Sequence, residues 1–63
     1  MKTTEIKAGQ RLVDEDGDLL TVHTVYGRGR NRQVRYSAKR KPGRMLYMTI
    51  QRFAQRVVRA ASD

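Results

Sequence analysis

The feature that most constrains the fold is an uninterrupted stretch of eight residues, 19–26, rich in β-branched and aromatic side chains. It contains no Gly or Pro, and this composition is typical of a β-strand. Asp16-Gly17 precedes it and Gly27 follows it, so a turn is expected at each end. Both of its faces are partly apolar, as in the central strand of a small barrel. The more continuous face consists of Leu20, Val22, Thr24 and Tyr26.

Three further segments have the properties of strands. They are residues 11–14, 33–38 and 45–49. The middle one alternates cleanly, so Val34 and Tyr36 would face one way and Arg35 the other. Pro42-Gly43 supplies the turn that follows it. The pattern predicts short antiparallel strands joined by tight turns.

The C-terminal segment carries apolar residues at helical spacing. They are Ile50, Phe53, Ala54, Val57, Val58 and Ala61. Thr49 can cap this helix. Three arginines, Arg52, Arg56 and Arg59, fall near the opposite side of the helix. A second interpretation stays open, in which residues 50–53 form one 3₁₀ turn and Val57-Val58 belong to a fifth strand that closes an SH3-like barrel.

Together these segments predict a mainly β fold. We expect a small antiparallel, SH3-like meander or partial barrel of four or five strands with a C-terminal helix or helical turn. Residues 1–63 would form a single domain, with residues 1–8 as a loose segment or the start of an edge strand. A chain of this length buries only about 60% of its unfolded surface. Because it lacks Cys, disulfides cannot add stability, whereas a homodimer could.

Basic residues are concentrated in one part of the chain. The stretch 28–59 contains eleven of the fourteen Lys and Arg residues and no Asp or Glu, in a protein of net charge +8. Like charges at this density repel one another, and the commonest use of such a field is contact with nucleic acid. The predicted binding residues are Arg28, Arg30, Arg32, Arg35, Lys39, Arg40, Lys41 and Arg44. On the expected helix, Arg52, Arg56 and Arg59 form either a solvated outer face, which is favoured, or a secondary basic face that binds nucleic acid.

The predicted binding residues fall into two loops and one strand. Arg28, Arg30 and Arg32 alternate along a hairpin arm, so on an extended ribbon they would form one guanidinium row about 13–14 Å long. Arg suits this role because its planar fork binds two phosphate oxygens at once. Residues 39–44 form a second basic loop at the opposite end of the expected sheet. The two loops would therefore bracket the sheet face that carries Arg35.

Three tyrosines could either stack on bases or pack in the core. Because large apolar residues are few, the core is favoured for Tyr36, while both roles stay open for Tyr26 and Tyr47.

Catalytic and metal-binding chemistry is not expected. His23 is the only histidine, there is no thiol, and no acidic residue lies near His23 in the sequence to orient it as a base. The acidic residues of 14–18 indicate a solvated loop, which could also neutralise a basic patch on a second copy. They lack a His partner, so no metal or cofactor is predicted. No apolar run approaches the roughly 20 residues of a membrane span, and a cytoplasmic protein is expected.

The opening sequence, Met1-Lys2-Thr3-Thr4-Glu5-Ile6-Lys7-Ala8-Gly9-Gln10, resembles the start of short proteins of unknown function encoded by lambdoid phages and enterobacterial prophages. In that group this start precedes a hairpin with Asp and Gly, a strand rich in Val and Thr, and a closing segment with Phe. The matching positions here are Asp16-Gly17, residues 20–25 and Phe53. The resemblance implies a small phage-derived protein in the cytoplasm of a host cell, and it supplies no activity and no functional residues.

Three hypotheses for function follow. The first is a nucleic-acid-binding protein that makes mainly phosphate contacts, with DNA favoured over RNA. The second is a phage protein that binds and modulates an acidic host protein through its basic surface. The third is a basic subunit that dimerises through a sheet edge or its helix, with charge serving solubility.

Overall fold

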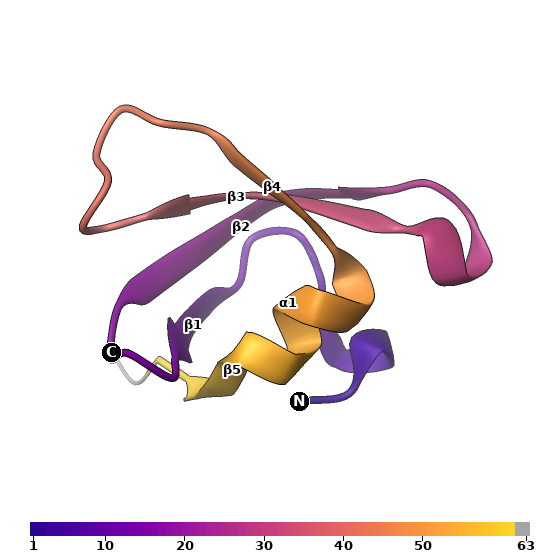
Figure 1. Ribbon diagram of the computed structural model, residues 1–63, viewed down its shortest axis with the longest axis horizontal. Coiled ribbons are helices and arrows are strands. Elements are labelled where there is room, and N and C mark those ends of the chain that lie inside the picture. Colours follow the sequence, from indigo (N-terminus) through magenta and orange to yellow (C-terminus); the bar gives the residue numbers. More distant parts are fainter. Residues whose placement is uncertain (62–63) are drawn as a thin grey trace.

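The computed structural model describes residues 1–61, and within them five strands form one antiparallel sheet (Figure 1). The strands are β1 (Arg11–Asp14), β2 (Leu19–Tyr26), β3 (Gln33–Ala38), β4 (Leu46–Thr49) and β5 (Val57–Ala60). The helical elements are η1 (Thr3–Glu5) and η2 (Gly29–Asn31), which are 3₁₀ helices, and α1 (Ile50–Arg56). The strand order β4-β3-β2-β1-β5 curls into a half-barrel, which confirms the predicted mainly β, SH3-like partial barrel.

Strand β2 coincides with the predicted central strand, but it does not keep one set of residues inward along its length. Leu20 and Val22 are buried, and the pairing with β3 then shifts between Val22 and Thr24. A β-bulge of this kind inserts one extra residue and so exchanges the two faces of the strand. Beyond it Val25 packs against the core, whereas Thr24 and Tyr26 are exposed. The prediction that the apolar face continues through Thr24 and Tyr26 is therefore wrong.

The core lies between the concave side of the sheet and α1. The rings of Tyr36 and Phe53 pack with centroids 4.9 Å apart and planes tilted by 57°. Burial raises the pKa of the Tyr36 hydroxyl above its usual value of 10.0, opposed by the charge of Arg56 and reinforced by that of Asp14. The buried apolar residues are Ile6, Leu12, Leu20, Val22, Val34, Tyr36, Ala38, Ile50, Phe53, Ala54 and Val57.

The C-terminal segment combines the two interpretations that the sequence left open. Helix α1 begins after Thr49, whose hydroxyl accepts a hydrogen bond from the backbone N–H of Arg52 at 3.4 Å, and it ends at Arg56. The chain then extends, and β5 pairs with β1 while Val57 is buried. The prediction that the helix continues beyond Arg56 is thus wrong, and the predicted fifth strand is confirmed. Helical spacing of apolar residues could not reveal this, because β5 forms by pairing with the edge of β1. None of the described helices is long and apolar enough to cross a membrane.

The N-terminal segment differs from the loose segment or edge strand that the sequence suggested. It forms the single 3₁₀ turn η1, and Ile6 directly behind the turn is 3% exposed within the core. The amino group of Met1 donates a hydrogen bond to the carbonyl of Ala54 at 3.2 Å. The backbone N–H of Gly9 donates to the carbonyl of Val22 at 2.8 Å. These contacts place the first residues against α1 and β2.

Candidate nucleic-acid interface

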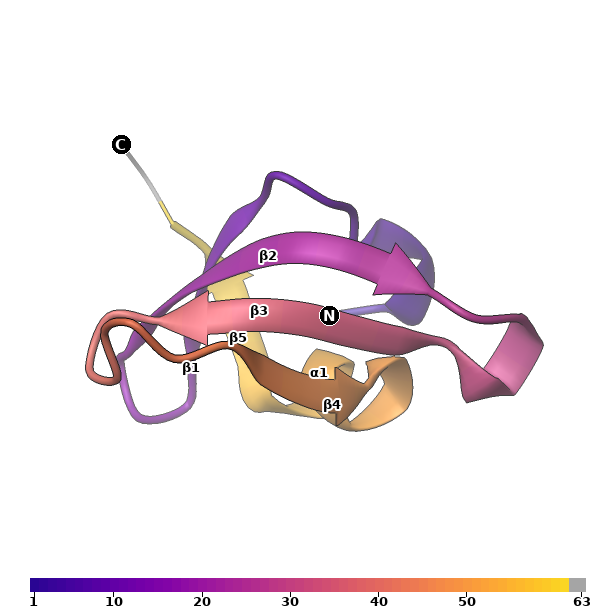
Figure 2. The same cartoon turned by 90° about the horizontal axis from the view of Figure 1, so that it is seen from above.

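The convex side of β2, β3 and β4 faces the viewer in Figure 2. The residues on this side are polar or aromatic and exposed to solvent. Two rows of paired residues form this outward sheet face: Thr24–Arg35–Tyr47 and Tyr26–Gln33–Thr49. All of these residues are exposed. The sequence contains no Asp or Glu between Asp18 and Asp63. The outward sheet face and the loops at its ends therefore contain no acidic residue.

The three tyrosines separate into one core residue and two exposed residues. Tyr36 is 6% exposed, which confirms its predicted place in the core. Tyr26 and Tyr47 are 43% and 59% exposed and lie on the outward sheet face. The hydroxyl of Tyr26 donates to Oε1 of Gln33 at 3.1 Å, which directs the side chain across β2 toward β3. Arg35 lies on β3, between the strands that carry the two tyrosines. Two aromatic rings and a guanidinium group therefore lie on one surface.

The β2–β3 loop, residues 27–32, does not form the extended guanidinium row that the spacing predicted. Helix η2 coils the middle of the loop, and the backbone N–H of Asn31 donates to the carbonyl of Arg28 at 3.0 Å. A 3₁₀ turn advances only about 2 Å per residue and repeats every three residues, so alternate residues do not share a face. Arg28 and Arg30 are exposed, whereas Arg32 is half-buried and its Nε donates to a carbonyl within the loop at 3.3 Å.

The β3–β4 loop, residues 39–45, lies at the opposite end of the sheet from the β2–β3 loop, as predicted (Figures 1 and 2). Lys39, Lys41 and Arg44 are exposed in it. Within residues 1–61 their side chains make no hydrogen bond or ion pair. The outward sheet face therefore ends in unpaired cations on this side too.

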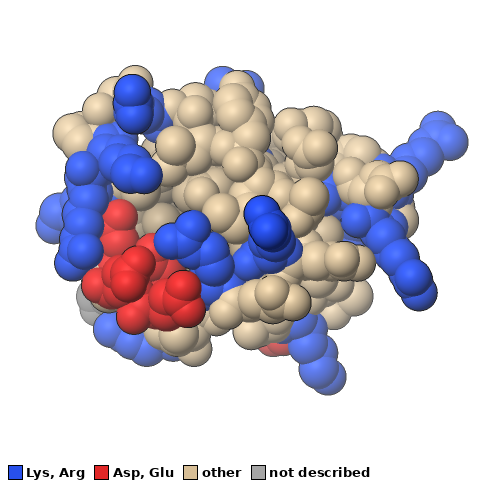
Figure 3. Space-filling view, viewed as in Figure 1, with Lys and Arg blue, Asp and Glu red and all other residues tan. Residues whose placement is uncertain are grey.

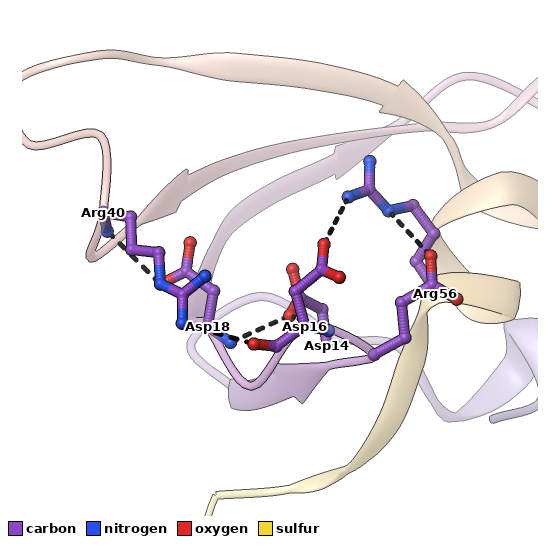
Figure 4. A network of polar contacts seen from close by, with 6 residues as sticks. Asp14, Asp16, Asp18, Arg40 and Arg56 are labelled. Carbon is purple, nitrogen blue, oxygen red and sulfur yellow. Dashed lines mark hydrogen bonds and ion pairs between the residues drawn. The ribbon is translucent and has the colours of Figure 1, made fainter.

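The acidic hairpin, residues 14–18, is an ordered corner rather than the solvated loop that the sequence suggested (Figure 4). Asp14 and Asp18 are only 6% and 9% exposed. Oδ1 of Asp14 accepts hydrogen bonds from the backbone N–H groups of Asp16 at 2.9 Å and Asp18 at 2.8 Å. Oδ1 of Asp18 accepts from the backbone N–H of Arg40 at 3.2 Å, and the Arg40 guanidinium donates to the carbonyl of Asp16 at 3.3 Å. Arg40 is thus tied to the hairpin.

The secondary basic face predicted on the helix does not form as one surface. Arg52 and Arg56 lie on α1, but Arg59 lies on β5, because the helix ends before it. Arg56 forms ion pairs of 3.9 Å with Glu15 and with Asp16 of the acidic hairpin (Figure 4). The charge of Arg56 is therefore partly neutralised within the chain.

Between the acidic hairpin and β4 lies a cleft of about 200 Å³. Its apolar lining includes Leu20, Tyr36, Leu46, Met48 and Phe53. Its charged lining includes Asp14, Asp16, Asp18, Arg40, Lys41 and Arg56. Because charges of both signs line it, the cleft attracts a polyanion less than the acid-free sheet face does.

Acidic and basic side chains are distributed unevenly over the surface. In the view of Figure 3 most of the visible acidic side chains form one cluster with basic side chains beside it, while other basic side chains project from the ends of the molecule. Within the described residues, several predicted binding side chains take part in no hydrogen bond or ion pair. They are Arg28, Arg30, Arg35, Lys39, Lys41 and Arg44.

Comparisons with protein-family models, with curated proteins and with solved structures gave no match. The interpretation of the site therefore depends on its geometry and charge. Across residues 1–61, no group of three or more His, Cys, Asp or Glu side chains is placed to hold a metal ion. Sequence reasoning missed the contacts of Arg40 and Arg56 with the acidic hairpin, for which the only signal was that the acids are grouped in one turn.

Proposed function

We propose that this protein is a small basic nucleic-acid-binding module that contacts mainly the phosphate backbone, with DNA as its ligand. The observation that carries the proposal is an acid-free sheet face with unpaired cations at its centre and at both ends. Arg35 is central, the β2–β3 loop contributes Arg28 and Arg30, and the β3–β4 loop contributes Lys39 and Arg44. A polyanion laid along β3 from one loop to the other meets positive charge along its path.

The form of α1 supports phosphate contact over sequence readout by a helix. It is seven residues long, and Ile50, Phe53 and Ala54 are buried on its inner side. A recognition helix enters the major groove with several side chains free to reach base edges. Contacts from loops and from Arg35 position a backbone without reading sequence, so weak sequence preference is expected.

A binding role is also favoured over catalysis. Nε2 of His23 and Oγ of Ser37 share a hydrogen bond of 2.9 Å on the exposed side of the sheet. A nucleophile–base pair needs a third group that orients the base. No Asp or Glu occurs in the strands that carry this pair, so no carboxylate from those strands can play that part. An origin in a phage or prophage and a place in the host cytoplasm stay predictions.

The test is a binding titration against a random duplex and against a single strand of the same sequence at several salt concentrations. Each neutralised phosphate contributes about −0.9 to the slope of log affinity against log salt for duplex DNA and about −0.7 for single strands. Five contacts would therefore give slopes of about −4.5 and −3.5. A slope near zero, or no binding near physiological salt, would contradict the proposal and favour an acidic host protein as the partner.

A further inference from the structure

The outward sheet face carries two aromatic side chains that are not part of the hydrophobic core. Tyr47 is 59% exposed and Tyr26 is 43% exposed, whereas the third tyrosine, Tyr36, is 6% exposed. In the part of the chain that is described, the hydroxyl of Tyr47 makes no hydrogen bond, and that of Tyr26 bonds only to Gln33 on the same face. The rings therefore lie at the surface beside Arg35 rather than under neighbouring side chains.

We propose that the outward sheet face binds single-stranded DNA, with one base stacked on Tyr47, a second on Tyr26, and the connecting backbone held by Arg35. This inference rests on the proposed function and specifies the form of nucleic acid. Stacking of bases on aromatic side chains above a positively charged track is the usual way in which proteins hold single strands without reading their sequence.

The geometry separates the two stacking positions. Tyr26 lies on β2 and Tyr47 on β4, with β3 between them, and their pairing rows are adjacent on the outward face. Strand spacing then puts their Cα atoms about 12 Å apart. The two rings are too far apart to enclose one base, so each would take its own. Arg35 pairs with Tyr47 across β3 and β4, where it can reach a phosphate of the backbone that connects the two bases.

The same geometry disfavours duplex DNA as the main ligand. In a duplex the base faces are stacked on one another, and only base edges are accessible from the grooves. A sheet face with two surface rings and no projecting helix has few groups that could enter a groove and contact base edges. Unpaired bases expose the π-faces that tyrosine rings can cover. The proposed contacts need no 2′-hydroxyl, so DNA is sufficient as the ligand.

The protein supplies its own reporter for this test. It contains three Tyr and no Trp, so its intrinsic fluorescence comes from tyrosine alone, and Tyr36 is shielded in the core. We would titrate the full chain with oligothymidylate of about 12 nucleotides, with a mixed-sequence duplex of the same length, and with the matching oligouridylate. The expected result is partial quenching of fluorescence by the single strand and tighter binding of the DNA strand than of the duplex.

The variants distinguish stacking from charge. Tyr47→Ala should weaken binding of the single strand about 5- to 150-fold, the range found when a stacked aromatic is truncated, and leave the salt slope unchanged. Tyr47→Phe keeps the ring and should bind like the parent protein. Val58→Ala is the matched control, because Val58 is 60% exposed on β5, outside the outward sheet face. Far-UV circular dichroism and a urea titration verify that each variant is folded.

Each outcome bears on a different claim. If the single strand binds with a steep salt slope while Tyr47→Ala and Tyr26→Ala both retain full affinity, stacking is overturned and the phosphate-contact function stands. Tighter binding of the duplex than of the single strand also overturns the inference alone. Tighter binding of oligouridylate than of oligothymidylate overturns the assignment to DNA. If no nucleic acid binds, the proposed function and this inference fail together.

Discussion

Arginines lie both on the outward sheet face and at the acidic hairpin, but only those at the hairpin contact oxygen atoms of the protein. On the outward sheet face, Arg35 is exposed, with no acidic residue in its strand or the adjacent strands. At the acidic hairpin, Arg40 and Arg56 contact carbonyl or carboxylate oxygens of residues 15–18. Net charge therefore overstates the basic surface that is available to a polyanion. Only cations without an internal partner keep their full field for a ligand.

The two regions also differ in what their charges contribute to stability. The ion pairs of Arg56 are 3.9 Å long between side chains that are about half exposed, so each contributes at most about 1 kcal/mol. The carboxylate of Asp14 is buried and accepts two short hydrogen bonds from backbone N–H groups of the turn, so it stabilises the conformation of the turn. The free cations of the outward sheet face contribute no such contacts, so their removal should leave the fold intact.

The largest expected effect is on the acidic hairpin. Asp14→Ala should lower the free energy of unfolding by about 3 kcal/mol, because two backbone N–H groups lose a charged acceptor. Glu15→Ala is the control in the same turn and should change it by no more than about 1 kcal/mol, since Glu15 is exposed and only pairs with Arg56. Urea unfolding measures both, and equal effects would show that Asp14 has no special role.

The next effect concerns the β2–β3 loop. Gly27 has a φ of +96°, and a Cβ there would lie 2.9 Å from the carbonyl oxygen of Asn31. Gly27→Ala should therefore cost about 2 kcal/mol and shift the loop arginines, which weakens nucleic-acid binding as well. Gly29→Ala is the control, because its φ is +55° with nothing within 4 Å of an added Cβ, and it should cost about 1 kcal/mol. The two costs are compared by urea unfolding, and similar costs would show that the close contact at Gly27 is unimportant.

The smallest expected effect tests whether the acidic hairpin restrains the basic surface. The double variant Glu15→Gln/Asp16→Asn removes both ion pairs of Arg56 and two negative charges. Affinity for nucleic acid should rise a few-fold at low salt, because two negative charges that repel phosphate are removed from beside the β3–β4 loop. The gain should vanish at high salt. Unchanged affinity at low salt would show that the negative charge of the hairpin does not act on the bound phosphates.

Local sequence was sufficient to predict most of the fold and part of the site. The strand at 19–26, the turn at Asp16-Gly17 and the core position of Tyr36 follow from residue type and alternation, and the structure confirms them. The β-bulge after Val22 could not be predicted, because it depends on how β2 pairs with β3 rather than on the residues of β2 alone. It brings Tyr26 to the same outward face as Arg35.

The remaining differences have the same cause, which is pairing between distant parts of the chain. The segment after Arg56 has helical spacing, yet it becomes β5 beside β1. The spacing of Arg28, Arg30 and Arg32 suggested a row, but η2 coils the loop. The grouping of acids in one turn did not reveal that their partners would include Arg40, which is more than 20 residues away along the chain.

Two double variants with the same loss of charge test directly whether the outward sheet face binds the phosphates. Arg28→Ala/Arg30→Ala removes two exposed cations at one end of the outward sheet face, and Arg52→Ala/Arg59→Ala removes two exposed cations from α1 and β5. Binding of oligothymidylate is measured for both across a range of salt concentrations. If the outward sheet face binds the phosphates, the first variant should lose about 1.4 units of salt slope and the second almost none. Equal loss in both variants would show that only total charge matters and that the outward sheet face is not the phosphate-binding surface.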